Sequence, residues 1–486
     1  MKRYYKGIQV IGAVLFSFII FYGLFHQILC LRFPYPLEYR EGVVQLWVNN
    51  LVNGQSLYPE IQQTPPYLHN PYTPLYYIIT GFFQRIMPDA SVFLSGRILS
   101  FLSMLLSCFL VFKITCLKSK KIAGLLASAL FFCSPVVINY GCLELVDMMA
   151  LCFGLAGIYL ALKGGTSGMI LSGIMCVCSI LVKPIFILPF ISILVSNVFN
   201  KDNKKKYFLA TSAGCIIIAF SVLFYRYRAD IFNHLIILNR LPLSFFHFMN
   251  VFANIGVRHV FLFCALCIFI GLMKDKNDPV YWYCVLSPIT LLFSAKIGSE
   301  ANYFLEIIAL SAISSGIIFA TINTSIKKIA LVACIAQIFL FLPFKPAPVF
   351  TKTYGQELPA AIGSEPTGTL KEAGDMIIGE LMSVFDPVLS EDIGWLISAK
   401  KEVIIEPYQF SQLAKYGRWN DTYIVEMIKE KQFNLILMST ESYEDSGGKF
   451  TRNMLESIKE NYSVKRIIGN TYILEPIFWA ENNKNW

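Results

Sequence analysis

Long apolar runs separated by short Lys-rich breaks occupy most of the first 345 residues. A helix needs about twenty apolar residues to cross a bilayer. The first run has no small-residue cleavage site, so we expect a retained membrane helix rather than a signal peptide. A shorter run at 75–88 is expected not to span. The pattern predicts about eleven spanning helices, at residues 7–30, 94–114, 122–139, 146–162, 167–182, 184–199, 207–225, 255–273, 279–295, 303–322 and 328–345.

The Lys residues between these runs predict the orientation of the chain, because Lys and Arg collect in cytoplasmic loops. If Met1–Lys6 is cytoplasmic, alternation puts four Lys-rich breaks on the same side, at 118–121, 201–206, 274–276 and 327–328. The opposite side then carries residues 31–93, 139–146, the turn at 183, 226–254 and 296–302. We therefore expect a multi-pass membrane protein with a cytoplasmic N-terminus and a tail on the outer side.

The tail, residues 346–486, has a different pattern from the rest of the chain. Short apolar runs predict strands at 387–389, 402–405, 433–438 and 472–474. Helical patterns lie between them at 370–385, 421–431 and 451–461. Such alternation is typical of a small α/β domain. The Pro-rich link from Pro343 to Pro359 is expected to be extended. Two domains follow: a membrane core at 1–345 and an extracytoplasmic α/β domain at 346–486.

Composition excludes several classes of protein. Charged residues make up 15% of the chain and hydrophobic residues 55%, whereas soluble domains carry about 25% charged residues. An ordinary soluble enzyme and a disordered chain are both excluded. The net charge is +9, but no basic, aromatic-interleaved groove sequence is present, so nucleic acid is not an expected partner.

The cysteines indicate neither a disulfide framework nor a metal site. The chain has 13 Cys, most of them inside apolar runs, where Cys behaves as a small hydrophobe. No DxD pair stands beside Glu41, so a metal clamp for a nucleotide sugar is not expected. We predict no cofactor with a defined set of ligands, and a divalent cation in the functional site stays an open alternative.

The first outer loop contains two carboxylates directly after the first apolar run. Glu38 and Glu41 are three residues apart, with Arg40 between them, so both carboxylates share one face if the segment is helical. A carboxylate beside the bilayer suits a general base for a reaction at the interface. The alternative is a solvated cluster of Glu and Arg that forms local ion pairs.

Four more charged residues lie at the outer ends of predicted spans: Arg97, Asp147, Lys183 and Lys296. Ionisable groups at membrane depth are costly and often functional. Each has a structural alternative: Arg97 can extend to the interface, and Asp147 can pair with Lys183. Together they predict a polar ring on one side of the bilayer, and therefore a site.

The order of the motifs resembles the polyprenyl-phosphate-sugar-dependent glycosyltransferases of the C-type membrane (GT-C) fold. The chain is similar to the family 39-like bacterial branch, which is related to protein O-mannosyltransferases and lipid A aminoarabinose transferases. An acidic residue follows the first span. The other motifs are Gly54-Gln55-Ser56-Leu57-Tyr58, Pro71-Tyr72-Thr73-Pro74-Leu75-Tyr76-Tyr77, Gly96-Arg97, Val146-Asp147, Leu181-Val182-Lys183-Pro184, Gly298 to Glu306, Val388-Leu389-Ser390-Glu391-Asp392 and Glu406-Pro407-Tyr408-Gln409-Phe410.

The resemblance implies a multi-span core with amphipathic helices in the first outer loop and an outward cavity in the plasma (inner) membrane. Its catalytic carboxylate matches Glu41 best and Glu38 next, with Asp147 as a further candidate. The family's donor is a sugar on a polyprenyl phosphate, and the acceptor is a protein, lipid or glycan. One in-line displacement implies inversion at the anomeric carbon. The base takes the proton of the acceptor hydroxyl, and cations stabilise the leaving phosphate.

The remaining site candidates follow from charge and position. The predicted phosphate-binding residues are Lys183, Lys296 and Arg97, with Arg240 and Arg258 as weaker candidates. The predicted sugar or acceptor pocket contains Arg40, Tyr72, Asn302, Tyr303, His234 and Asn239.

Two other functions fit a polytopic chain. A transporter or flippase of a lipid-linked or small polar substrate also needs polar groups inside a helix bundle. It should show charges near mid-span and internal repeats, whereas here the charges lie at outer ends. A non-catalytic scaffold that presents the tail leaves Glu41, Lys183 and Lys296 unexplained.

Overall fold

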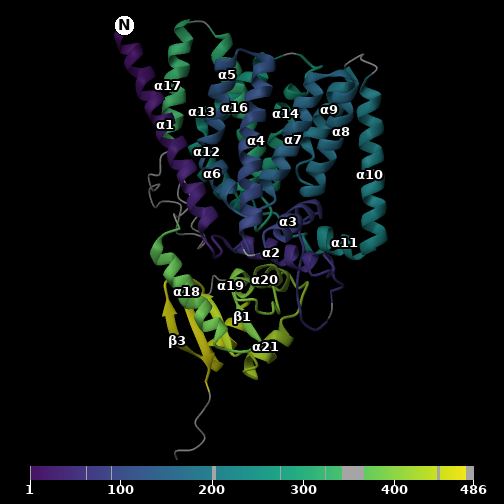
Figure 1. Cartoon of the computed structure of the whole chain (residues 1–486), viewed down its shortest axis with the longest axis vertical. Helices are drawn as coiled ribbons and strands as arrows, with labels where there is room; N and C mark the ends of the chain where they lie inside the picture. Colours follow the sequence, from purple (N-terminus) through teal and green to yellow (C-terminus); the bar gives the residue numbers. More distant parts are fainter. Residues whose placement is uncertain are drawn as a thin grey trace, which may run out of the picture.

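A helical bundle lies against a smaller sheet-containing domain, and two short helices of the first loop lie between them (Figure 1). This computed structural model describes residues 2–61, 63–88, 90–199, 204–273, 275–322, 324–341, 366–445 and 449–477. The N-terminus is at the end of the bundle far from the sheet domain (Figure 1). The predicted link from Pro343 to Pro359 lies outside the described residues.

The bundle is built from the apolar runs of the sequence. Its longest members are α1 (Lys2–Arg32), α4 (Leu94–Lys118), α7 (Asp147–Lys163), α8 (Gly165–Val182), α10 (Lys205–Tyr227), α16 (Leu305–Thr321) and α17 (Thr324–Phe341). The shorter members are α5 (Lys121–Phe132), α6 (Pro135–Cys142), α9 (Leu188–Phe199), α12 (Phe245–Arg258), α13 (Val260–Leu272), α14 (Pro279–Leu286) and α15 (Pro288–Phe293).

Five of these described helical segments are long and apolar enough to cross a membrane: Val10–Arg32, Leu94–Lys118, Gly165–Val182, Lys205–Tyr227 and Ala301–Thr321. Two bent pairs, α5 with α6 and α12 with α13, bring this number to seven if each pair is one span. Each of the predicted runs contains helix, while the predicted count of eleven spans stays a prediction.

Prolines break two of the predicted spans, and a third is sharply bent. The run at 122–139 bends by 66° where α6 begins at Pro135, because proline has no N–H to continue the helix. Pro288 separates α15 from α14 in the same way. The run at 255–273 is also not straight, since α12 and α13 meet at a 90° bend. The predicted loop at 226–254 contains the first part of α12, which begins at Phe245.

The layer between bundle and sheet domain consists of short elements. These are α2 (Tyr39–Val52), α3 (Leu75–Ile86), α11 (Asp230–Phe232), the π-helix η1 (Asn233–Leu238) and the 3-10 helix η2 (Ala301–Phe304). Helix α2 touches α19 of the tail backbone to backbone. A Cβ on Gly42 would lie 2.5 Å from the Gly394 nitrogen, so only glycine permits this contact. The tail is thus packed directly against the loop that carries the candidate carboxylates.

The described part of the tail contains a four-stranded mixed sheet with the order β1-β2-β4-β3. Its strands are β1 (Val388–Ser390), β2 (Leu435–Ser439), β3 (Tyr462–Ile468) and β4 (Thr471–Pro476). β1 and β2 are parallel, and the other pairs are antiparallel. Its helices are α18 (Gly368–Met382), α19 (Ile393–Ser398), α20 (Pro407–Lys415), α21 (Thr422–Lys429), α22 (Thr440–Asp445) and α23 (Arg452–Asn461).

One predicted strand of the tail is wrong, and one strand was missed. Residues 402–405 do not join the sheet; Ile405 forms an isolated bridge with Tyr67 of the first loop. Strand β3 was not predicted because three of its five inner residues are polar and all five are exposed, with burial only at Tyr462 and Ile468. The predicted helices at 370–385, 421–431 and 451–461 are confirmed as α18, α21 and α23.

Candidate functional site

A cavity of about 350 Å³ lies where the bundle, the first loop and the tail meet. Its wall combines residues that are hundreds of positions apart in the sequence. Eight residues predicted from the sequence line it: Glu38, Arg40, Tyr72, Lys183, Asn239, Lys296, Asn302 and Tyr303. The sequence therefore located one shared chamber, although not all of its members.

Glu38 stands at the entrance to α2 and faces the cavity. It is the N-cap of the helix, and its carboxylate accepts a hydrogen bond from the Arg40 N–H at 3.0 Å. The Arg40 guanidinium bonds both Glu38 oxygens at 3.0 Å and reaches Glu300 at 2.8 Å. Burial raises the pKa of Glu38 to about 7, although the nearby Arg40 charge lowers it. A carboxyl with a pKa near neutrality is suited to exchange protons at physiological pH.

Lys183 lies at the C-terminal end of α8 and is paired with Asp147. Its Nζ is 2.6 Å from Asp147 Oδ1, and the same oxygen accepts a bond from Asn302 Nδ2 at 3.0 Å. The ammonium group also lies over two rings, 5.2 Å from the centroid of Tyr72 and 5.5 Å from that of Tyr303. Asp147 does not line the cavity itself, so it positions Lys183 rather than facing a ligand.

Lys296 is placed by a short backbone bridge between residues 242–244 and 295–297. Ser244 N–H donates to the Ala295 carbonyl at 2.7 Å, and Ile297 N–H donates to the Pro242 carbonyl at 3.0 Å. The Lys296 ammonium donates to the side-chain oxygen of Asn239 at 2.7 Å. Burial and the Lys183 charge lower the pKa of Lys296 to about 8. Lys296 is therefore still mainly charged at pH 7.

The tail supplies one wall of the cavity, and the residues of this wall were not among the predicted site residues. Glu406, Tyr408, Gln409 and Lys449 all line it. Tyr67 fixes this wall, because its N–H donates to the Ile404 carbonyl at 2.8 Å and its carbonyl accepts from Glu406 N–H at 2.9 Å. Burial raises the pKa of Glu406 to about 8, so this carboxyl is largely protonated at pH 7. Glu406 stands directly before Pro407 at the start of α20. This position is the sequence feature that could have identified Glu406 as a candidate.

Two histidines connect the first loop to η1. His69 Nε2 lies 2.9 Å from the His234 carbonyl, and the two rings stack at 5.9 Å. Burial and the neighbouring His234 lower the pKa of His69 to about 3, so its ring is neutral. His234 was predicted as a pocket residue, but both of its ring nitrogens are occupied by Asn70 N–H and the Pro59 carbonyl. It does not line the cavity, whereas His69 does.

Glu41 lies outside the cavity, in a closed cluster of hydrogen bonds. Its side chain is 0% exposed. Arg97 binds both carboxylate oxygens at 2.8 Å, and the Leu37 and Glu144 N–H groups donate at 2.7 and 2.8 Å. The two candidate carboxylates do not share a helical face, because Glu38 caps α2 from outside whereas Glu41 is in its first turn. A carboxylate with this many donors has no free lone pair directed at a substrate.

Three cations expected to bind phosphate lie away from the cavity. Arg97 uses its remaining N–H groups on the carbonyls of Cys30, Phe33 and Tyr35. Arg240 is exposed, and its carbonyl accepts a bond from Arg418 of the tail. Arg258 ends α12, and its carbonyl accepts from Gln337 on α17. Neither Arg240 nor Arg258 lines the cavity.

The charges that remain favour an anionic ligand. The cationic residues of the cavity are Arg40, Lys183, Lys296 and Lys449, and the acidic ones are Glu38, Glu300 and Glu406. Because the pKa values of Glu38 and Glu406 are raised to about 7 and about 8, part of the negative charge is neutralised at pH 7. Among the residues that the structure describes, no metal-type group of three His, Cys, Asp or Glu lines this chamber; the one such group is His26, Cys30 and Cys142.

Comparisons with solved structures identify the fold. ArnT from Cupriavidus metallidurans in its apo state aligns with a TM-score of 0.63 at 12% identity, over 94% of this chain and 97% of that one. The same protein bound to undecaprenyl phosphate gives 0.59 at 12% identity, with the same coverage. The apo oligosaccharyltransferase of Archaeoglobus fulgidus gives 0.55 at 10% identity, over 93% of this chain and 73% of that one.

These neighbours are GT-C glycosyltransferases, and the chain has the GT-C fold of a multi-pass membrane protein. The polytopic α-helical, GT-C-like fold class expected from the sequence is confirmed. No protein-family model matches the sequence, and no curated protein sequence matches it. Since identity to the solved structures is only 10–12%, the likeness establishes the fold and not the activity.

Proposed function

We propose that this protein is a membrane glycosyltransferase that moves a sugar from a polyprenyl-phosphate carrier to an acceptor on the extracytoplasmic side. The observation that carries the proposal is the cavity, in which a carboxyl with a pKa of about 7 stands among basic side chains. The ArnT structure with the same fold contains undecaprenyl phosphate, which agrees with a lipid-phosphate donor.

The chemistry needs one base and a stabilised leaving group. The acceptor oxygen attacks the anomeric carbon while the bond from that carbon to the phosphate oxygen breaks. Glu38 takes the acceptor's proton, and the electron pair leaves with the polyprenyl phosphate. Arg40, Lys183 and Lys296 stabilise the charge on that phosphate, as fixed cations do in water-excluded sites. One displacement inverts the configuration of the sugar.

A lipid donor also needs a path between the cavity and the bilayer. Helix α12 begins directly after Ser244, whose N–H is bonded to the segment that carries Lys296. Leu243 and Phe245 are more than 70% exposed there. We propose that this apolar edge lies in the membrane interface, where exposed aromatic and aliphatic side chains are favoured, and that the polyprenyl chain leaves the cavity along it.

The tail wall is the proposed acceptor side. Tyr408 and Lys449 reach the cavity from the tail, whereas the proposed phosphate-binding cations come from the first loop and the bundle. Lys449 lies over the ring of Tyr39 at 4.7 Å, directly beside Glu38. An acceptor hydroxyl held between these residues would meet the base on the face of the sugar opposite the phosphate.

The direct test is transfer by the purified full chain in liposomes. A panel of polyprenyl-phosphate sugars is added together with a membrane extract as the source of acceptor. We expect release of polyprenyl phosphate and a labelled acceptor with inverted linkage. Glu38→Gln should reduce release at least a hundredfold, since general-base catalysis contributes about 10²–10⁴. Glu372→Gln, an exposed substitution on α18, is the matched control and should remain active.

Two results would contradict the proposal. Movement of the intact donor between leaflets, without cleavage of its sugar–phosphate bond, would identify a flippase instead. Full release by Glu38→Gln would remove Glu38 from the reaction.

A further inference from the structure

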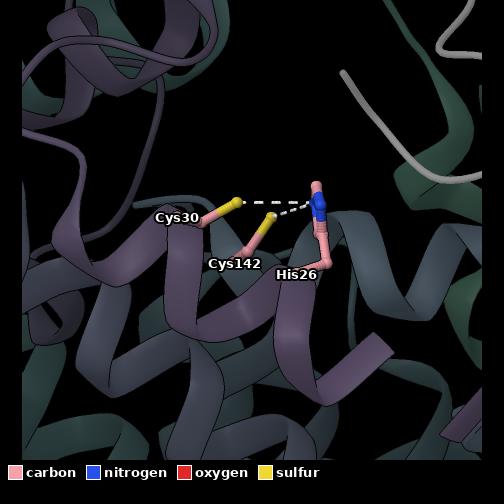
Figure 2. Close-up of side chains that lie close together, drawn as sticks. All are labelled: His26, Cys30 and Cys142. Atoms are coloured by element: carbon pink, nitrogen blue, oxygen red, sulfur yellow. Dashed lines mark hydrogen bonds between the residues drawn. The ribbon is translucent and has the colours of Figure 1, made fainter. Parts of the chain in front are cut away.

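One imidazole and two thiols form a cluster (Figure 2), and none of the three residues lines the cavity. His26 and Cys30 belong to α1, and Cys142 is the last residue of α6. Both sulfurs point toward the imidazole (Figure 2): Cys30 Sγ is 3.4 Å from His26 Nε2, and Cys142 Sγ is 3.7 Å from it. All three candidate ligand atoms lie within 4.8 Å of one another.

The helices bring these groups together without help from a loop. His26 and Cys30 are four residues apart and therefore share one face of α1. Cys142 reaches them because α6 packs closely against α4 at the preceding residue. A Cβ on Gly141 would lie 2.3 Å from Met104 Sδ, so a side chain there would push the end of α6 away. The cluster is thus part of the rigid packing of the bundle.

The imidazole is buried with weak partners. His26, Cys30 and Cys142 are 1%, 1% and 3% exposed. His26 Nδ1 has no hydrogen-bond partner among the described residues, and Nε2 faces only the two sulfurs. Thiols are weak donors and weak acceptors. A buried imidazole is ordinarily well hydrogen-bonded, so this ring lacks the strong partner that its position demands.

We propose that His26, Cys30 and Cys142 bind a thiophilic d10 metal ion, with Cu(I) as the expected occupant. Atoms that bind one ion at about 2.0–2.3 Å lie roughly 3.5–4 Å apart, and the distances from the two sulfurs to Nε2, 3.4 and 3.7 Å, are close to this spacing. Thiolates select soft ions such as Cu(I) and Zn(II). A structural zinc site normally has four protein ligands, whereas this group has three, and its burial leaves little access for water.

The ion would connect α1 to α6 next to the Glu41 cluster. The Cys30 carbonyl accepts a hydrogen bond from Arg97 Nη1 at 3.0 Å, and Arg97 holds Glu41. A ligand that binds only the folded state stabilises it. The role of the ion is therefore structural: it fixes the end of α1 from which the first outer loop departs. This role does not depend on the proposed sugar transfer.

The test is metal binding by the full chain, reduced and treated with a chelator before purification in detergent. Cu(I) and Zn(II) are offered separately against a chromophoric competitor, and bound metal is counted by mass spectrometry. We expect one Cu(I) that raises the thermal unfolding midpoint. X-ray absorption should show two sulfur ligands and one nitrogen ligand. Cys142→Ser should weaken binding about tenfold or more, because even loss of an outer-shell partner costs about 10–100-fold.

A matched control is needed because the chain has 13 Cys. Cys264 and Cys267 are exposed and have a CxxC spacing, so the double variant Cys264→Ser/Cys267→Ser tests for binding elsewhere. It should keep the Cu(I) and its absorption spectrum. Equal loss in this control, no bound metal in the wild type, or a Cys30–Cys142 disulfide in non-reduced protein would overturn the proposal. If Cys142→Ser fails to fold, the wild-type absorption spectrum still decides the ligands.

Discussion

Arg97 and Glu41 form a bidentate ion pair, with Arg97 Nε and Nη2 each 2.8 Å from a different carboxylate oxygen of Glu41. The pair is fully buried and joins α4 to α2. Through its other N–H groups, Arg97 also holds the backbone where the first loop leaves α1. The carboxylate that best matches the family's catalytic residue is therefore placed as a structural anchor for the loop, next to the cavity but not in it.

The anchor predicts a stability effect. Glu41→Gln removes the carboxylate that is hydrogen-bonded to the buried Arg97 charge, and breaking such a pair costs about 3–5 kcal/mol. We expect a loss of that size in the free energy of unfolding, measured by denaturant titration in detergent. The control is Arg452→Ala in the exposed pair with Glu456, whose side chains are 86% and 57% exposed; such pairs contribute about 0–1 kcal/mol. A Glu41→Gln protein of normal stability and no activity would return the catalytic role to Glu41.

The proposed base and the proposed phosphate ligand predict a bell-shaped pH profile. Glu38 must be deprotonated to act, and its pKa is raised to about 7, so activity should fall as the pH drops through that value. Lys296 must be charged to bind phosphate, and its pKa is lowered to about 8, so activity should fall as the pH rises through that value. The measurement is kcat/KM for donor release, which reports the free enzyme.

One variant tests the alkaline limb of this profile on its own. Lys296→Arg, which stays charged at all accessible pH values, should extend activity on the alkaline side and leave the acid limb in place. An alkaline limb that persists in Lys296→Arg would assign it to another group.

How much of this arrangement the sequence predicts depends on the range of the interactions involved. Apolar runs predict helices because burial in lipid is local to each segment, and Pro135 marked a bend that could have been read from the sequence. The charged ends of the spans pointed to a shared site, and Lys183 and Lys296 do line one cavity.

The rest depended on contacts between distant segments. Glu406 and Lys449 reach the cavity only because Tyr67 pairs with Ile405 and α2 packs on α19. Glu38 and Glu41 differ in their surroundings because α2 begins between them, which turns one carboxylate to the cavity and the other to Arg97. A helix start can shift by one residue with little sequence signal, so spacing alone could not separate the two.

The pair of Lys183 and Asp147 makes a prediction that separates a binding role from a structural one. If Lys183 binds the donor phosphate, Lys183→Ala should raise the Kd for polyprenyl phosphate about tenfold or more, because charge-assisted bonds contribute about 1.5–3 kcal/mol. Asp147→Asn should weaken binding less than Lys183→Ala does, since the amine stays beside the cavity but loses the carboxylate that positions it. The measurement is displacement of a fluorescent polyprenyl phosphate, with exposed Lys429→Ala as control. Equal loss in both variants, restored in the double variant, would indicate a purely structural pair.

The orientation of the chain has its own test. We expect residues 366–477 and the first outer loop on the extracytoplasmic side, opposite Met1–Lys6. A protease added outside spheroplasts should cut the tail at its exposed segments. A tag inserted in the break at 118–121 should stay protected until the membrane is opened. Protection of the tail in intact spheroplasts would reverse the topology and place the cavity on the cytoplasmic face.

A structure of the full chain with polyprenyl phosphate tests directly whether the cavity binds the donor phosphate. We predict phosphate density in the cavity within hydrogen-bond distance of Arg40, Lys183 and Lys296, with the lipid chain running along α12. Density for the phosphate beside Arg258 or on the outer surface, with the cavity empty at saturating lipid, would contradict the account.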